Sequence, residues 1–247
     1  MNYMQSPYSM PPAVKNLLIV NVLFFLACIV FKSTFDIPIE KYLGLHIPIA
    51  EDFYIFQFVT YMFLHAYPEP THIFFNMFAL FMFGRTIESI WGTKRFLLFY
   101  FVTGIGAGLI QELVYTIRIL QLTSQLSPEL VEMVKNEGGA LLQQNLNYAN
   151  ETLGNLNKLL HTVTVGASGA IYGLLLAFGM MFPNSIIMLM IPPIPMKAKY
   201  MVIIFAVISL GLGITGKQPS VAHFAHLGGM LFGFFMIRHW KKTGNMY

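Results

Sequence analysis

The stretch TVTVGASGAIYGLLLAFGMMF, residues 162–182, decides the fold because all 21 of its residues are uncharged. A helix needs about 20 predominantly apolar residues to cross the hydrocarbon core of a bilayer. Comparable apolar runs lie at about residues 16–32, 72–90, 95–115, 197–214 and 221–238. The sequence therefore predicts an all-α polytopic membrane protein with six transmembrane helices.

The overall composition leads to the same class of protein. Of 247 residues, 56% are hydrophobic and only 11% are charged, against about 25% charged in soluble domains. This excludes a soluble globular enzyme. The net charge is +4, but the basic residues form no patch interleaved with aromatics, so we expect the lipid bilayer and no nucleic acid as a partner. The single cysteine, Cys28, excludes intramolecular disulfides and multi-cysteine metal sites.

The charges sort into two groups when successive loops are placed on opposite sides of the membrane. One side receives a single acid, Glu88, and nine basic residues: Lys15, Arg85, Lys94, Arg95, Lys197, Lys199, Arg238, Lys241 and Lys242. The other side receives six basic and ten acidic residues. By the positive-inside rule we expect both termini in the cytoplasm, as in a bacterial plasma (inner) membrane protein.

This topology divides the chain into a short N-terminal tail (1–14), a six-helix domain (15–240) and a short C-terminal tail (241–247). The loops at 33–71 and 116–161 are expected to face outward. The second loop is a polar insertion with apolar residues at helical spacing, including Leu126, Leu130 and Val134. We expect it to form one or two amphipathic helices on the outer surface. A short apolar run, Ser185 to Ile191, is expected to be re-entrant or interfacial.

Few residue types remain for chemistry inside the membrane. The two aspartates, Asp36 and Asp52, both lie in the first outward loop, and the sequence has no His-Glu-x-x-His zinc motif. His72, His223 and His226 lie within or at the edge of apolar runs. Polar groups are costly at such depth, which makes these histidines functional candidates.

Two small-residue segments stand out in the fourth and sixth runs. The first contains Gly166, Ser168, Gly169 and Gly173, and the second contains His226, Gly229 and Gly233. Taken alone, each is read more simply as a face for close helix packing. Together they agree, because Ser168 and His226 would each lie roughly 8–9 Å below the outer ends of their helices, at ~1.5 Å per residue. The glycine spacing of 0, 3 and 7 would bring the two backbones close enough for a serine–histidine hydrogen bond.

A serine next to a neutral histidine is a usual nucleophile–base pair. Here it would be a dyad, because no aspartate lies in any predicted span. Tyr172, one turn after Ser168, could orient the imidazole by stacking. His72 and Asn76 share a face at i and i+4, either as oxyanion donors or as a pair of interhelical hydrogen bonds. His223 competes with His226 for the role of base, and the glycine spacing favours His226.

This constellation resembles the rhomboid family of intramembrane serine proteases. The resemblance covers about residues 50–115 and 160–238. It rests on Phe63-Leu64-His65-Ala66, on His72 to Met77, on Gly84 to Gly92 with Glu88, on Arg95-Phe96 through Tyr100, on Gly166 to Gly173, and on Ala225 to Gly229 with Gly233.

The resemblance implies a compact six-helix bundle that hydrolyses single-span membrane proteins near their outer end. Ser168 would be the nucleophile and His226 the base, with His72, Asn76 and the Ser168 backbone N–H as the oxyanion site. Tyr172 falls where the family stacks an aromatic ring on the base. No metal or cofactor is needed.

Two features depart from the family pattern. The Trp-Arg pair common in the first loop reads Phe56-Gln57 here, which puts the anchoring of that loop in doubt. The 116–161 insertion is longer than a minimal connection and leaves its role open. A non-catalytic rhomboid-like protein that binds membrane-helix clients is the main alternative, whereas a transporter is disfavoured because no Asp, Lys or Arg lies mid-span.

Overall fold

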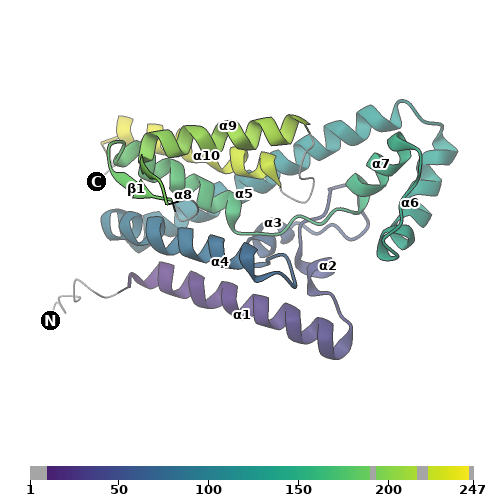
Figure 1. The fold of residues 1–247 in the computed structure, drawn as a ribbon, viewed down its shortest axis with the longest axis horizontal. Helices are drawn as coiled ribbons and strands as arrows, with labels where there is room; N and C mark the ends of the chain where they lie inside the picture. Colours follow the sequence, from purple (N-terminus) through teal and green to yellow (C-terminus); the bar gives the residue numbers. More distant parts are fainter. Residues whose placement is uncertain (1–9, 190–192, 216–221, 245–247) are drawn as a thin grey trace.

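The computed structural model describes residues 10–189, 193–215 and 222–244. Its long helices lie alongside one another, with the start of α1 and the end of α10 at one end of the molecule and the α6–α7 pair at the other (Figure 1). The elements are α1 (Pro12–Phe35), α2 (Ile39–Leu43), α3 (Gln57–Thr60), the 3-10 turn η1 (Tyr61–Phe63), α4 (Pro70–Ala79), the π-helical turn η2 (Leu80–Gly84), α5 (Arg85–Thr123), α6 (Pro128–Gln143), α7 (Glu151–His161), α8 (Ser168–Met181), β1 (Ile186–Met188), β2 (Pro195–Lys197), α9 (Ala198–Thr215) and α10 (His223–Lys242).

Three helical stretches of the described residues are long and apolar enough to cross a membrane: Pro12–Phe35, Pro70–Thr123 and Ala198–Thr215. The middle stretch is not straight, because Gly92 has φ 74° and ψ 162°. Its two legs correspond to the runs expected at 72–90 and 95–115. The prediction of an all-α membrane protein is confirmed, while the count of six spans stays a prediction because α8 and α10 are not among the three stretches.

Gly92 turns the chain back on itself. A Cβ there would meet no atom within 4 Å, so the positive φ rather than lack of space requires glycine. After the turn, Phe96 packs back towards Gly84, where a Cβ would lie 3.4 Å from its ring. The fully buried Phe96, Phe99 and Tyr100 of α5 therefore form the centre of the core.

Glu88 fastens the start of α1 to this turn. Its carboxylate accepts hydrogen bonds from the backbone N–H groups of Ala13 (2.9 Å) and Val14 (2.8 Å) and from the Thr93 hydroxyl (2.8 Å). The first N–H groups of a helix have no acceptor within the helix, and their partial positive charge attracts an anion. Both carboxylate oxygens of this buried acid therefore accept hydrogen bonds.

The fourth helix differs from the sequence expectation. Residues 162–165 form an extended segment, Gly166 and Ala167 turn the chain, and α8 begins only at Ser168, so the expectation that Ser168 lies about six residues inside its helix is wrong. The extended segment pairs with the first loop, because Leu45 and Thr164 exchange backbone hydrogen bonds of 2.9 and 2.8 Å. Gly166, at φ 130°, consequently lies outside the helix and shares no helical face with Gly169 and Gly173.

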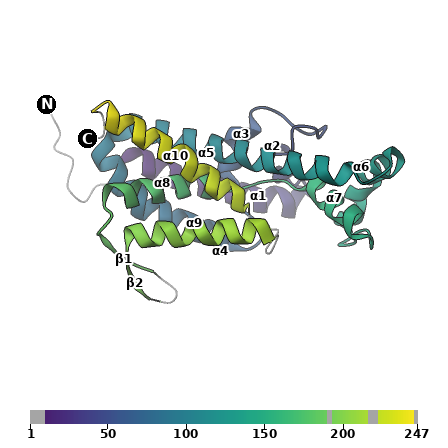
Figure 2. The same ribbon diagram turned by 90° about the horizontal axis from the view of Figure 1, so that it is seen from above.

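The short apolar run after α8 contributes a strand to a hairpin. β1 and β2 are antiparallel, with Ile187 opposite Met196, and they project beside α9 (Figure 2). The remainder of the run, residues 190–191, lies outside the described residues. The same holds for most of the expected N-terminal tail (1–9) and for the last three residues of the C-terminal tail (245–247).

The 116–161 segment contains the end of α5 and the helices α6 and α7. α5 continues past the expected end of its span at residue 115 as far as Thr123. A small core joins the three helices to the first loop, and its fully or nearly buried members are Ile47, Tyr115, Ile119, Val134 and Leu156. The segment therefore packs as a cap on the end of the bundle, opposite the start of α1 and the end of α10 (Figure 1).

Candidate active site

Ser168 occupies the first position of α8, at the end of the extended segment. Gly166 donates its backbone N–H to the Tyr61 carbonyl oxygen (2.9 Å), and its φ of 130° directs the chain into the helix. A Cβ on Gly166 would lie 3.1 Å from the His72 ring, so glycine is required by both conformation and space. The Ser168 backbone N–H belongs to the first turn, whose N–H groups have no acceptor within the helix.

His226 lies in the first turn of α10, which crosses α8 at very close range. A Cβ on Gly229 would overlap the Gly169 carbonyl group, and one on Gly233 would lie 3.5 Å from the Gly173 backbone. These glycines thus let the two helix backbones touch. As a result His226 Nε2 and Ser168 Oγ are 2.9 Å apart, within hydrogen-bond distance.

The His226 ring is held in place from one side by Tyr172. The two rings are stacked, with centroids 4.0 Å apart and planes 7° apart. The Nδ1 atom of His226 has no hydrogen-bond partner among the described residues, so no third acid orients it there. The ring of His223 lies edge-on to that of His226, with centroids 6.2 Å apart, and the hydrogen bond to Ser168 is made by His226.

His72 is fixed in one tautomer by its surroundings. Its Nδ1 accepts a hydrogen bond from the Ala66 backbone N–H (3.1 Å), so a neutral ring carries its proton on Nε2. The Nε2 atom and the Ser168 Oγ both lie beside Gly166, 3.1 and 3.6 Å from the position that a Cβ would take. The His72 Nε2 atom and the serine hydroxyl therefore both lie next to the space beside Gly166.

Asn76 lies one turn after His72 on α4 and is buried. Its side-chain amide donates one hydrogen bond to the His72 carbonyl oxygen (3.1 Å). An amide NH₂ group has two hydrogens, so the second is left for another acceptor.

Gln111 is a site residue that the sequence reasoning missed. Its side-chain oxygen accepts a hydrogen bond from the backbone N–H of Ala225 (3.0 Å), directly before His226. The neighbouring Glu112 receives a longer hydrogen bond (3.4 Å) from Thr164, upstream of Ser168. Two consecutive buried residues of α5 thus contact both segments that carry the dyad. The signal was a pair of polar residues inside the apolar run 95–115.

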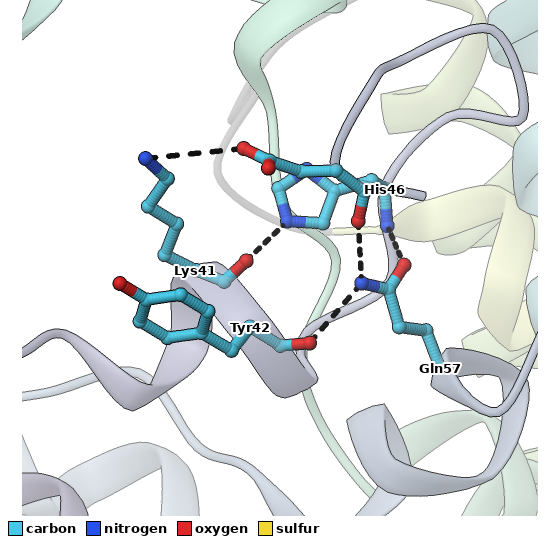
Figure 3. A network of polar contacts seen from close by, with 5 residues as sticks. Lys41, Tyr42, His46 and Gln57 are labelled. Carbon is cyan, nitrogen blue, oxygen red and sulfur yellow. Dashed lines mark hydrogen bonds and ion pairs between the residues drawn. The ribbon is translucent and has the colours of Figure 1, made fainter. Parts of the chain in front are cut away.

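Gln57 replaces the arginine of the common family pair and organises the first loop (Figure 3). Its side chain is fully buried. The amide nitrogen donates to the carbonyl oxygens of Tyr42 (3.2 Å) and Asp52 (2.8 Å), and the amide oxygen accepts from the N–H groups of His46 (3.3 Å) and Tyr54 (3.2 Å). A neutral amide therefore joins four backbone positions of this loop without introducing a buried charge.

The arrangement of these side chains is of the type that suits acyl transfer. A serine hydroxyl faces a histidine base, and N–H donors face the same space. Among the described residues, no group of three or more His, Cys, Asp or Glu side chains could hold a metal.

Comparison with known proteins identifies the family of this chain. The Rhomboid domain family matches residues 52–119 and 133–240 of the chain. The chain is 27% identical over 195 residues to a protein described as "Rhomboid protease AarA" from Providencia stuartii. The aligned part covers 75% of this chain and 58% of that relative. Because the family match spans well over half of the residues, the chain belongs to the rhomboid family.

Proposed function

We propose that this protein is an intramembrane serine endopeptidase in which Ser168 and His226 form a catalytic dyad. The observation that supports the proposal most directly is the 2.9 Å contact between Ser168 Oγ and His226 Nε2. It is supported further by membership of the rhomboid family and by similarity to a relative described as a protease.

In the proposed reaction, the Ser168 hydroxyl attacks the carbonyl carbon of the scissile peptide bond and its proton passes to His226 Nε2. His226 then gives this proton to the leaving amine. The same histidine next takes a proton from a water molecule, whose oxygen attacks the acyl carbon. The bond to Ser168 Oγ then breaks, and His226 returns the proton to this oxygen, which restores the serine. Tyr172 acts as a positioning residue, because its stacked ring limits rotation of the imidazole.

The negative charge that develops on the carbonyl oxygen needs donors that are in place beforehand. The Ser168 backbone N–H meets this need at the positive end of the α8 dipole. The His72 Nε2–H, fixed by the hydrogen bond from Ala66, and the second hydrogen of the Asn76 amide would complete the oxyanion site.

The short α8 supports cleavage inside the membrane near one face. At ~1.5 Å per residue, its 14 residues span roughly 21 Å, about 9 Å less than the ~30 Å hydrocarbon core. If the far end of α8 reaches one boundary of the hydrocarbon core, Ser168 lies about 9 Å below the other boundary. Non-helical backbone at this depth needs hydrogen-bond partners from within the protein. Leu45 pairs with both backbone groups of Thr164, and the Tyr61 carbonyl oxygen accepts from the Gly166 N–H.

This depth suits a single-span membrane protein as substrate. Such a helix must unwind locally before its peptide carbonyl is accessible, so cleavage is expected at helix-destabilising residues near the Ser168 end. By the charge distribution, that end faces away from the cytoplasm and both termini face inward, as in a bacterial inner membrane protein.

The test uses the purified full chain in liposomes with a single-span substrate. The unchanged protein is expected to cleave it and to react with a serine-directed fluorophosphonate at Ser168. Ser168→Ala should abolish both signals, and His226→Ala should reduce both far more than His223→Ala.

Undiminished cleavage by Ser168→Ala would overturn the mechanism. A folded protein that captures membrane helices equally well with and without Ser168, and is never labelled, would instead establish the non-catalytic binding alternative.

A further inference from the structure

An apolar groove runs along the seam between α9 and α10, with a volume of about 510 Å³. Its floor includes the buried Val202 and Met230, while Ile203, Val207 and Leu231 on its rim are 57%, 63% and 45% exposed. The groove is therefore open to the surroundings of the bundle, which for these helices is lipid. On α10 the lining begins with Leu227 and Gly228, which directly follow His226 in the sequence.

The cationic side chain of Arg118 lies at one end of this groove. The Arg118 guanidinium donates a hydrogen bond to the Gly213 carbonyl oxygen of α9 (2.6 Å) and lies 5.3 Å from the centre of the Phe224 ring of α10. Phe224 precedes Leu227 by one helical turn, so the cation contacts both walls just beyond the apolar lining. A guanidinium has five N–H donors, and one bond to Gly213 leaves others for an anionic oxygen.

The distances along the helices match the dimensions of a bilayer. Gly92 adjoins Trp91, which packs edge-on against Trp240, and such tryptophans mark a membrane interface. From Gly92 to Arg118 the rise is ~39 Å at 1.5 Å per residue, close to the ~40–45 Å between opposite headgroup regions. Arg118 therefore lies at headgroup level on the Ser168 side.

The groove and the cation at its end together span about one leaflet. The α10 lining runs from Leu227 to Phe234, a rise of ~10 Å. Measured from Phe224, which contacts Arg118, the rise to Phe234 is ~15 Å, half of the ~30 Å hydrocarbon core. A transmembrane helix of a partner would continue through both leaflets and so would extend well past the end of this lining. An acyl chain attached to a phosphate fits both the length and the charge.

We propose that Arg118 and the α9–α10 groove form a binding site for one phospholipid of the leaflet on the Ser168 side. The lipid phosphate accepts hydrogen bonds from Arg118, and one acyl chain lies in the groove against Leu227 and Leu231. The site is independent of the proposed proteolysis, because it uses neither Ser168 nor the His226 side chain.

The test is photo-cross-linking in liposomes that contain a trace of phosphatidylglycerol with a diazirine on one acyl chain. Cross-links on the full chain are mapped by peptide mass spectrometry. We expect them to concentrate on Val207 and Leu231. Arg118→Gln should lower labelling of these positions at least fivefold, Arg118→Lys should restore much of it, and Ala206→Trp should block it by filling the groove.

Two matched controls use other parts of the surface. Leu23→Trp adds the same ring to an exposed position of α1 (58%), and Lys41→Gln removes an exposed charge; both should leave groove labelling unchanged. A diazirine diacylglycerol, which lacks phosphate, should label the groove several-fold more weakly.

Labelling spread evenly over all lipid-facing helices, or equal labelling in Arg118→Gln and the unchanged protein, would overturn the proposal. So would a single-span substrate helix that cross-links to Leu231 and displaces the lipid.

Discussion

Gly229→Ala tests whether close backbone contact between α8 and α10 creates the dyad. The added methyl group would overlap the carbonyl group of Gly169, which directly follows Ser168, and Gly229 itself lies one turn after His226. Because non-bonded heavy atoms settle at about 3.5–4.0 Å, the helices must separate by on the order of 1 Å. The 2.9 Å contact between the serine and the histidine would then exceed the ~2.6–3.2 Å reach of a proton-transferring hydrogen bond.

The expected loss of activity is much larger than the loss of stability. Alanine gains about 1 kcal/mol over glycine in a helix, whereas overpacking costs roughly 1–3 kcal/mol. The net destabilisation of about 0–2 kcal/mol leaves most molecules folded. A misplacement of ~1 Å, however, can lower a reaction rate about 10²-fold.

The assay compares fluorophosphonate labelling and substrate cleavage in liposomes with the midpoint of denaturant unfolding. Gly211→Ala in α9 is the matched control, because a Cβ there meets nothing within 4 Å; it should keep full activity. If folded Gly229→Ala protein is labelled within threefold of the unchanged rate, the argument from backbone contact is refuted.

Three further predictions concern buried polar contacts. Gln111→Ala should slow labelling of Ser168 several-fold and lower the free energy of unfolding by about 1–3 kcal/mol, because it leaves the Ala225 N–H unpaired. Gln111→Glu keeps an acceptor and should retain more activity. Equal labelling rates in the unchanged protein and both variants would contradict a positioning role. Glu88→Ala should lower the denaturant midpoint of unfolding, because it removes an anion from the start of α1. At denaturant concentrations well below that midpoint, the rate of Ser168 labelling should be unchanged. An unchanged midpoint would show that the contact does not contribute to stability. Gln57→Ala should make the first loop more sensitive to limited proteolysis, with Lys41→Gln as a surface control, and an identical cleavage pattern would argue against its anchoring role.

The 10-residue α4 and the long α5 show how much local sequence could foresee. Apolar length predicted the helices on either side of Gly92, and the composition predicted their membrane environment. The start of α8 was misplaced because residues 162–167 are as apolar as the helix that follows. In the structure that segment lies outside the helix and forms backbone hydrogen bonds with Leu45 and Tyr61, and neither contact is local in sequence.

The candidate site, too, was predictable from the sequence only in part. The sequence by itself determined which polar groups are present in the apolar runs, because charge and hydropathy are properties of single residues. It also indicated Ser168 with His226, since glycine spacing is readable along a helix. Only the tertiary structure decided that the His72 ring lies beside Gly166, that Gln111 accepts a hydrogen bond from the residue before His226, and that Arg118 contacts α9 and α10 at one end of the groove. These contacts join residues far apart in the chain, and their distances depend on how whole helices pack.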